Sequence, residues 1–319
     1  MNNSEHPLGK TNVPRVSAII PVFNAVRTIS DAIESIEAQT FRDLEIIAVD
    51  DGSKDGSLDA MARFAPRVTI LRQQNRGPSA ARNHGVRESS GELLAFLDAD
   101  DRWRPEMVER LVAALDANPR ASMAYCDVAV IDSDGRPLMT ALASNPSPPT
   151  VGDMLDRLWP IMPSGVVMRR SALMAAGGWP ERLTSFEDVY LWLLMREQGE
   201  FVHLGEVLAE WRFAHFPNPL KPAGGQERAA RIFTQMVRER WGRPAAHLVA
   251  ARERAPRSIL GYIGLRALDE GDRIAARKAF ARAILFDRWR IRNYLRYMRT
   301  FLHPGAARML GGGSHPPRG

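Results

Sequence analysis

Three aspartates at the end of an apolar segment are the residues whose types and spacing could do chemistry. Residues 93–97 are apolar and are followed at once by Asp98, Asp100 and Asp101. Like charges crowded into one turn repel one another, and a bound cation offsets this repulsion. Hard oxygen ligands suit Mg²⁺ or Mn²⁺ holding a diphosphate. The turn therefore predicts such a site, with an Asp-rich turn that only caps the next helix as the alternative.

The segments that would position these aspartates alternate between the patterns of a strand and a helix. Strands are expected at 16–23, 44–49, 68–71 and 93–97, with helices over 28–39 and from about residues 57 and 79. Farther along, helices are expected over 105–118, 151–158 and 187–197, and strands over 122–131 and 165–169. The early alternation predicts a mostly parallel sheet with helices on both faces, and the later order is mixed.

Polar turns follow the first, second and fourth of these strands. The turns are Pro21-Val22-Phe23-Asn24, Asp50-Asp51-Gly52-Ser53 and Asp98-Ala99-Asp100-Asp101. Because parallel strands end at the same edge of a sheet, the three turns should form a ligand crevice. The chain has no GxGxxG after its first strand, no GxxxxGKS/T and no GxSxG. Dinucleotide oxidoreductases, P-loop kinases and serine hydrolases are therefore excluded.

Four motifs, in this order, resemble the inverting family 2 glycosyltransferases. They are VSAIIPVFN, LEIIAVDDGSKDGS, NRGPSAARNHGVRESSGELLAFLDADD and SFEDVYLWLLM, and the resemblance covers about Val16 to Arg212. It implies an α/β fold of the GT-A type, a Rossmann-like mixed sheet, here with a C-terminal α-helical appendage. It also implies a hexosyltransferase that uses Mn²⁺ or Mg²⁺ and takes a sugar from a nucleotide-diphosphate donor, with UDP-sugar expected. The acceptor would be a hydroxyl of a saccharide or polyprenyl-lipid-linked molecule in polysaccharide or glycoconjugate biosynthesis.

The resemblance also assigns the donor site. The residues expected to bind the nucleotide sugar are Pro21, Phe23, Asn24, Asp50, Asp51, Arg82, Asp98 and Asp100. The Asp50/Asp51 pair would accept a hydrogen bond from the base, for which an acceptor-only carboxylate is suited. Arg82 would approach the nucleotide, Asp98 the ribose, and Asp100 would hold the metal. Loop capping by the aspartate pair, and a helix-surface position for Arg82, are the alternatives.

Catalysis is placed by the resemblance at Glu187 and Asp188, which open a helix. Asp188 would act as the general base on the acceptor hydroxyl. Direct displacement at the anomeric carbon requires a carboxylate opposite the leaving group, and it inverts the configuration. Acids in the first turn of a helix are also favoured by the helix dipole alone, which is the alternative for this pair.

Three residues are assigned to the acceptor side, Gly178, Trp179 and Arg212. Gly178 gives a tight backbone and Trp179 an aromatic face suited to stacking on a sugar, although a core role for the tryptophan is an equal alternative. Arg212 matches the arginine of the family's aromatic-Arg-x-His segment, whose histidine reaches the metal. Here two residues separate Arg212 from His215. His215 as a metal ligand thus departs from the pattern, and a solvent-facing loop histidine is the alternative.

Charge divides the chain into two parts. Residues 220–319 hold 21 Lys+Arg against 7 Asp+Glu, a net charge of +14, which leaves −8 for residues 1–219. We expect a flexible leader over 1–14, a GT-A domain over 15–219, a basic helical region over 220–304 and a disordered tail over 305–319. The one cysteine, Cys126, excludes an internal disulfide and suits a cytoplasmic protein. No stretch approaches the ~20 consecutive apolar residues that a spanning helix needs.

Residues 289–302 predict an amphipathic helix. Its apolar stripe is Ile291, Leu295, Met298 and Phe301 or Leu302, flanked by Arg290, Arg292, Arg296 and Arg299. Such a helix can lie on an anionic membrane surface, here the inner face of the cell membrane, or pack on the preceding helices. No nucleic-acid partner is expected, because no recognised motif accompanies the charge. A catalytically silent nucleotide-sugar-binding or scaffold protein acting through this tail is the alternative to an enzyme.

Overall fold

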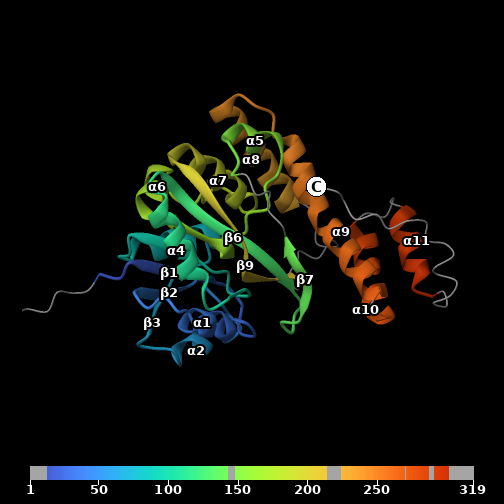
Figure 1. Ribbon diagram of the computed structural model, residues 1–319, viewed down its shortest axis with the longest axis horizontal. Helices are drawn as coiled ribbons and strands as arrows, with labels where there is room; N and C mark the ends of the chain where they lie inside the picture. Colours follow the sequence, from blue (N-terminus) through green and yellow to red (C-terminus); the bar gives the residue numbers. More distant parts are fainter. Residues whose placement is uncertain (1–12, 143–147, 214–223, 270, 287–290, 302–319) are drawn as a thin grey trace, which may run out of the picture. The chain divides into compact units, whose positions relative to one another are not determined.

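The structure is a computed structural model that describes residues 13–142, 148–213, 224–269, 271–286 and 291–301 (Figure 1). The chain forms two compact units. The first holds the described residues up to 213 together with Gly224–Ala245, and the second begins at Ala246. The expected leader and C-terminal tail lie almost wholly outside the described residues.

The described strands of the first unit form one mixed sheet in the order β3-β2-β1-β4-β8-β6-β9-β5, with β7 beside β6. The strands are β1 (Val16–Val22), β2 (Leu44–Asp50), β3 (Val68–Arg72), β4 (Leu93–Phe96), β5 (Arg102–Trp103), β6 (Ala121–Ile131), β7 (Pro137–Leu142), β8 (Val166–Arg169) and β9 (Glu200–Arg212). The first four run parallel, and β8 runs antiparallel to β4 and β6. A parallel half followed by a mixed half is the predicted fold class, which is confirmed.

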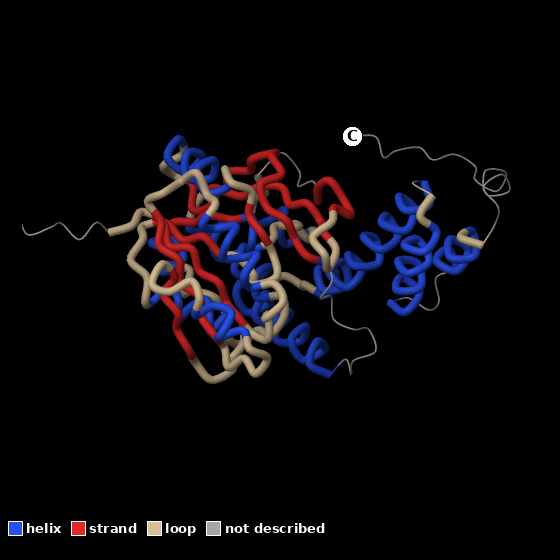
Figure 2. The backbone as a smooth tube through the Cα atoms, turned by 90° about the horizontal axis from the view of Figure 1, so that it is seen from below, coloured by secondary structure: helices blue, strands red, loops and turns tan. Residues whose placement is uncertain are grey.

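Helices cover both faces of this sheet (Figure 2). The described helices of the first unit are α1 (Ile29–Glu37), α2 (Ser57–Ala62), α3 (Pro78–Arg87), α4 (Met107–Ala117), α5 (Val151–Asp156), α6 (Arg170–Ala175), α7 (Glu187–Gln198) and α8 (Gly224–Trp241). On one face Ile20 of β1 lies in the same apolar cluster as Ile33 of α1 and Leu111 of α4. On the other face Val49 of β2 packs with Ala81 of α3. Strands covered on both faces read as continuous apolar runs, which is why their positions could be predicted.

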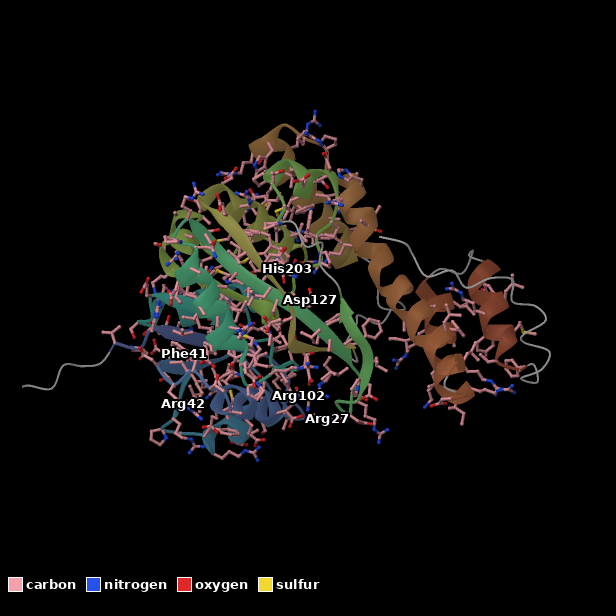
Figure 3. All side chains as sticks on the ribbon, viewed as in Figure 1. Arg27, Phe41, Arg42, Arg102, Asp127 and His203 are labelled. Atoms are coloured by element: carbon pink, nitrogen blue, oxygen red, sulfur yellow. The ribbon has the colours of Figure 1, made fainter. Side chains whose placement is uncertain are left out.

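The longest described strand, β9, is one that the sequence pattern does not predict. Its sequence EFVHLGEVLAEWR mixes charged, glycine and apolar residues without regular alternation. The strand is fixed by parallel pairing with β6. His203 of β9 also lies 2.9 Å from an Asp127 carboxylate oxygen and stacks on Tyr125, both on β6 (Figure 3). A contact between segments distant in sequence therefore decides this element.

Helix α8 packs within the first unit, although its sequence belongs to the basic C-terminal region. Phe233 stacks on Phe186 with ring centroids 5.1 Å apart, and Trp241 meets Tyr190 edge to face at 5.6 Å. Arg240 pairs with Glu197 of α7. Aromatic contacts, together with this ion pair, thus hold the helix against the first unit.

The second unit consists, in its described part, of α9 (Ala246–Asp269), α10 (Arg273–Phe286) and α11 (Ile291–Arg299). Gly264 of α9 allows close packing on α10, because a Cβ there would lie 2.5 Å from the Phe280 ring. The turn between the two helices has a left-handed Gly271, and Asp272 accepts hydrogen bonds from the first backbone amides of α10. In the described part of the chain no helix is both long and apolar enough to cross a membrane.

Glu45 of β2 provides a test of how the amino edge of the sheet is held. One of its carboxylate oxygens accepts hydrogen bonds from Ser17 Oγ (2.8 Å) and from Ser90 N (2.7 Å) and Oγ (2.9 Å). Burial opposes the charge, but these hydrogen bonds outweigh it and lower the pKa of Glu45. The Glu45 carboxylate therefore stabilises the fold at pH values above the ordinary pKa of a glutamate. This stabilisation is lost as the pH falls through the lowered pKa of Glu45.

We expect Glu45→Gln to reduce the free energy of unfolding by about 0.5 kcal/mol at neutral pH, since the carboxylate is partly exposed. The difference from the native chain should shrink as the pH falls below the ordinary pKa of a glutamate, about 4.3, and vanish once Glu45 is protonated in the folded chain. Urea unfolding over a series of pH values measures it. Glu92→Gln, at an exposed carboxylate, is the control and should change little; an equal loss in both variants would contradict this role of Glu45.

Candidate active site

The turns after β1 and β2 are joined by hydrogen bonds at the carboxyl edge of the sheet. Asn24 has a left-handed backbone (φ +50°), and its Oδ1 accepts from Lys54 N at 2.9 Å. Its own backbone amide donates to Ser53 Oγ at 3.0 Å. Phe23 is half exposed beside them, and Pro21 is partly buried. The structure thus brings together the predicted residues of the first two turns.

Asp51 uses both carboxylate oxygens to hold the loop before α3. One oxygen accepts from Gln73 Nε2 and Arg76 N, and the other from Gly77 N, each at 2.8 Å. This is the capping arrangement that the sequence left open. It fixes where α3 begins.

Asp50 is fully buried but keeps one oxygen available. Its Oδ1 accepts from Ser53 N at 3.0 Å. Its Oδ2 is buried without a hydrogen-bond partner among the described residues, and Arg72 Nε lies 3.5 Å away. Within the pair, Asp50 is therefore the carboxylate with an acceptor atom left for a ligand.

Arg82 is a buried cation at the centre of the site, 3% exposed. It pairs with Asp98 at 2.5 Å, and its Nη1 lies 3.9 Å from Glu187. Burial opposes its charge, but the nearby carboxylates of Asp98, Glu187 and Asp188 outweigh burial and raise the pKa of Arg82. The arginine thus joins the turn after β4 to the start of α7, and the helix-surface alternative does not describe its position.

Trp179 lies beneath this arginine and not at the surface. Its ring is 1% exposed, with the Arg82 guanidinium 4.3 Å from the ring centroid. Phe96 and Trp192 meet it edge to face at 5.1 and 5.8 Å. Trp179 is therefore a core residue, the alternative to sugar stacking that the sequence left open. Its ring makes a cation–π contact with Arg82.

The backbone around Trp179 is fixed by Asn83 of α3. Asn83 Oδ1 accepts from Trp179 N at 2.8 Å, and its Nδ2 donates to Trp179 O at 2.9 Å. Gly178 has φ +79°, and a Cβ there would lie 3.0 Å from Asn83 Oδ1. A glycine is therefore required for its backbone angle and for this close approach.

Glu187 and Asp188 open α7 after a left-handed Phe186 (φ +67°). Asp188 is buried, and its Oδ1 accepts from Val189 N at 2.8 Å. Both carboxylates act on Arg82. The predicted catalytic pair and the predicted donor residues thus belong to one charged cluster.

The turn after β4 turns Asp101 inward. Asp101 is buried and accepts from Ser164 Oγ (2.5 Å) and from Arg212 N (2.9 Å). Burial, with the charges of Asp100 and Asp98, raises the pKa of Asp101 well above its ordinary range. Asp101 is therefore a structural brace of the turn that carries Asp98 and Asp100.

Arg212 is a buried clamp on the same turn. Its Nε donates to the Asp100 carbonyl at 2.8 Å, and its Nη1 to the carbonyls of Asp132 and Ser133 at 3.2 and 2.8 Å. Near it Arg102 donates to the Gly135 carbonyl at 3.1 Å (Figure 3). The structure places Arg212 behind the aspartate turn, so its position supports the turn and does not face an acceptor.

Asp98 and Asp100 could hold a divalent cation only with ligand atoms from the substrate. Among the described residues no group of three His, Cys, Asp or Glu side chains forms a metal site. Mg²⁺ is commonly held by one or two carboxylates together with substrate phosphates, which this pair fits. His215 lies outside the described residues.

Burial raises the pKa of the Cys126 thiol to about 12, which excludes a thiolate nucleophile.

The model of "Glycosyl transferase family 2" matches residues 17–175 of this chain. The putative glycosyltransferase EpsE of Bacillus subtilis is 30% identical over 193 residues, which cover 58% of this chain and 68% of that protein. The succinoglycan biosynthesis protein ExoO of Rhizobium meliloti is 36% identical over 135 residues, covering 42% and 38% of the two chains. The chain belongs to glycosyltransferase family 2.

Other curated relatives are longer than this match. The chain spans 33% of an uncharacterized glycosyltransferase of Rickettsia felis and 54% of one of a Nostoc species.

Among solved structures, S. aureus TarS 1–349 in complex with UDP-GlcNAc has a TM-score of 0.55 at 16% identity, covering 90% of both chains. Mannosyltransferase PcManGT from Pyrobaculum calidifontis, in complex with GDP-Man and Mn²⁺, has 0.55 at 19% identity, covering 90% and 85%. These structures establish the GT-A fold.

Two positioning residues were missed from the sequence. Asn83 and Ser164 contact site residues from other elements, and nothing in their local spacing marks them. Arg212 was expected on the acceptor side, whereas its contacts make it a support of the aspartate turn. The sequence indicated a role for Asn83 only through its place within the motif NRGPSAARNHG.

We expect Arg212→Lys to lower the free energy of unfolding by about 2 kcal/mol. Lysine cannot reproduce the planar fork, and the carbonyls of Asp100 and Ser133 would lose their buried donors. Urea unfolding measures the change. Arg110→Lys, at an exposed pair with Glu206, is the matched control and should stay within about 0.5 kcal/mol of the native chain. An equal loss of unfolding free energy in the two variants would show that the Arg212 guanidinium does not stabilise the aspartate turn.

Proposed function

We propose that this chain is a metal-dependent, inverting glycosyltransferase that moves a sugar from a nucleotide-diphosphate sugar to an acceptor hydroxyl. The observation that carries the proposal is the buried Arg82, paired with Asp98 on one side and close to Glu187 on the other. One cation thereby holds the donor turn and the start of α7 together at the carboxyl edge of the sheet. This edge is where open α/β sheets bind their ligands.

The donor proposed is a UDP-sugar. Half-exposed Phe23 offers a ring beside the crevice, and Asp50 Oδ2 is a buried acceptor without a hydrogen-bond partner among the described residues. An acceptor-only carboxylate suits the imide N–H of uracil. The named structural neighbours carry UDP-GlcNAc and GDP-Man, which supports a nucleotide-diphosphate donor without deciding between bases.

The diphosphate would lie beside the aspartate turn and Arg82. Asp100 would hold Mn²⁺ or Mg²⁺, which when bound neutralises charge on the departing diphosphate, and Asp98 would approach the ribose. Nε and Nη1 of Arg82 are buried without hydrogen-bond partners among the described residues, so two donors remain for phosphate oxygens. Trp179 and Arg212, both buried, would act by positioning Arg82 and the aspartate turn.

Asp188 would take the proton from the acceptor hydroxyl as that oxygen attacks the anomeric carbon from the side opposite the diphosphate. The hydrogen bond from Val189 N holds one oxygen of this buried carboxylate at the start of α7. Glu187 would balance the charge of Arg82 beside it. Attack from the opposite side inverts the anomeric configuration.

The acceptor proposed is a saccharide or a polyprenyl-linked saccharide in polysaccharide biosynthesis, with the reaction in the cytoplasm. The relative named for succinoglycan biosynthesis supports the class of pathway. A buried lone cysteine suits a reducing compartment.

A panel of UDP-, dTDP- and GDP-sugars, measured by thermal shift and turnover with and without Mn²⁺, tests this proposal. We expect one donor to stabilise the protein only with the cation, and Asp100→Asn to lose that effect because a charged ligand is removed. Asp188→Asn should keep it and lose about 10²–10⁴-fold in turnover, since only the base is removed.

Asp59→Asn, at an exposed aspartate on α2, is the control and should match the native chain. Stabilisation by no nucleotide would contradict a glycosyltransferase. Native donor binding without turnover of any acceptor would favour the silent binding protein instead.

A further inference from the structure

Among its described side chains, helix α11 packs on the rest of the second unit through one side. Tyr297 lies against an apolar cluster formed by Ala267 of α9 and Ala276 and Phe280 of α10. Thr300, directly after the helix, is fully buried. The side of the helix that faces α9 and α10 is therefore the one that carries Tyr297 and Thr300. The apolar stripe predicted from the sequence, which includes Leu295 and Met298, does not lie on this side.

The opposite side exposes large apolar residues. Tyr294 is 42% exposed, Leu295 60%, Met298 60% and Phe301 52%. At about 100° per residue Tyr294, Leu295 and Met298 lie within an arc of about 100° on α11, and Phe301 follows two residues after the helix ends. We call these four residues the α11 face. A contiguous exposed apolar arc of this kind marks an interaction surface.

Arg277 of α10 fixes the direction of the α11 face. Its Nε donates to Thr300 Oγ1 at 3.2 Å, and its Nη2 to Thr300 O at 3.4 Å. Its guanidinium also lies 3.8 Å from the centroid of the Phe301 ring. The helix end is thereby held, and a cation sits at the border of the apolar arc.

Two further exposed cations lie on α10. Lys278 and Arg282 are one helical turn apart and follow the exposed Ile274. Over residues 246–319 the sequence holds 15 Lys+Arg against 5 Asp+Glu, a net charge of +10. The exposed apolar arc thus has Arg277 at its border and belongs to a strongly basic unit, which is the composition of a helix that lies in a lipid interface.

We propose that the α11 face docks on an anionic lipid surface, with its four side chains at the headgroup boundary and Arg277, Lys278 and Arg282 near lipid phosphates. Lipid matches both features of the surface, because it accepts apolar side chains without a shaped cavity and supplies negative charge. A second copy of the chain would bring a like charge to the contact. A nucleic acid would match the cations and leave the apolar arc uncovered. The proposal stands independently of the catalytic one.

Flotation of the full-length chain with vesicles tests the proposal. The vesicles contain phosphatidylcholine alone or mixed with phosphatidylglycerol, at low and high salt. We expect binding only to the mixed vesicles, weakened by salt. The double variant Leu295→Ser/Met298→Ser should bind at least about tenfold more weakly, because it removes exposed apolar surface only. Lys278→Gln should cost about fivefold.

Met174→Ser is the matched control, since Met174 of α6 is 59% exposed in the first unit. It should bind as the native chain does. Circular dichroism confirms that each variant folds, and donor thermal shifts, expected to be unchanged, separate this test from that of the active site. Equal vesicle binding by the double variant would overturn the proposal. So would a dimer that the double variant dissociates in sedimentation, or retention on DNA in place of vesicles.

Discussion

A buried guanidinium is the constraint on which the site depends. Arg82 is charged and removed from water, so it is stable only while carboxylates stay close to it. Asp98 comes from the end of β4, and Glu187 and Asp188 from the start of α7, about ninety residues farther along. Electrostatics thus forces two distant segments together at the edge of the sheet.

The surroundings of Arg82 are built to hold it in one place. Its α3 helix approaches β1 closely because Gly85 has no side chain; a Cβ there would lie 2.6 Å from Ile19. Trp179 supplies a flat ring beneath the guanidinium, and Asn83 fixes the backbone of that tryptophan. A residue held by packing and hydrogen bonds does not need to reorganise when a ligand arrives, which is the general advantage of preorganised sites.

The aspartate turn is supported in a comparable way from the other half of the sheet. β9 pairs with β6 and ends at Arg212, whose guanidinium and backbone amide bind the Asp100 carbonyl and the Asp101 carboxylate. The third of the clustered aspartates, Asp101, is thereby held in the interior. The mixed half of the sheet therefore acts as the support for residues carried by the parallel half.

The parallel strands, the three polar turns and the acid pair of α7 could be predicted because each has a local signature: an apolar run, a turn composition or a helix start. The sequence by itself determined the fold class and the family, and it named the residues of the candidate site. Only the tertiary structure decided that Asp51 caps a loop, that Trp179 and Arg212 are buried supports, and that α11 leaves its apolar side exposed. Those outcomes depend on contacts between segments distant in sequence, since burial and hydrogen-bond partners are properties of the packed chain and not of any local pattern.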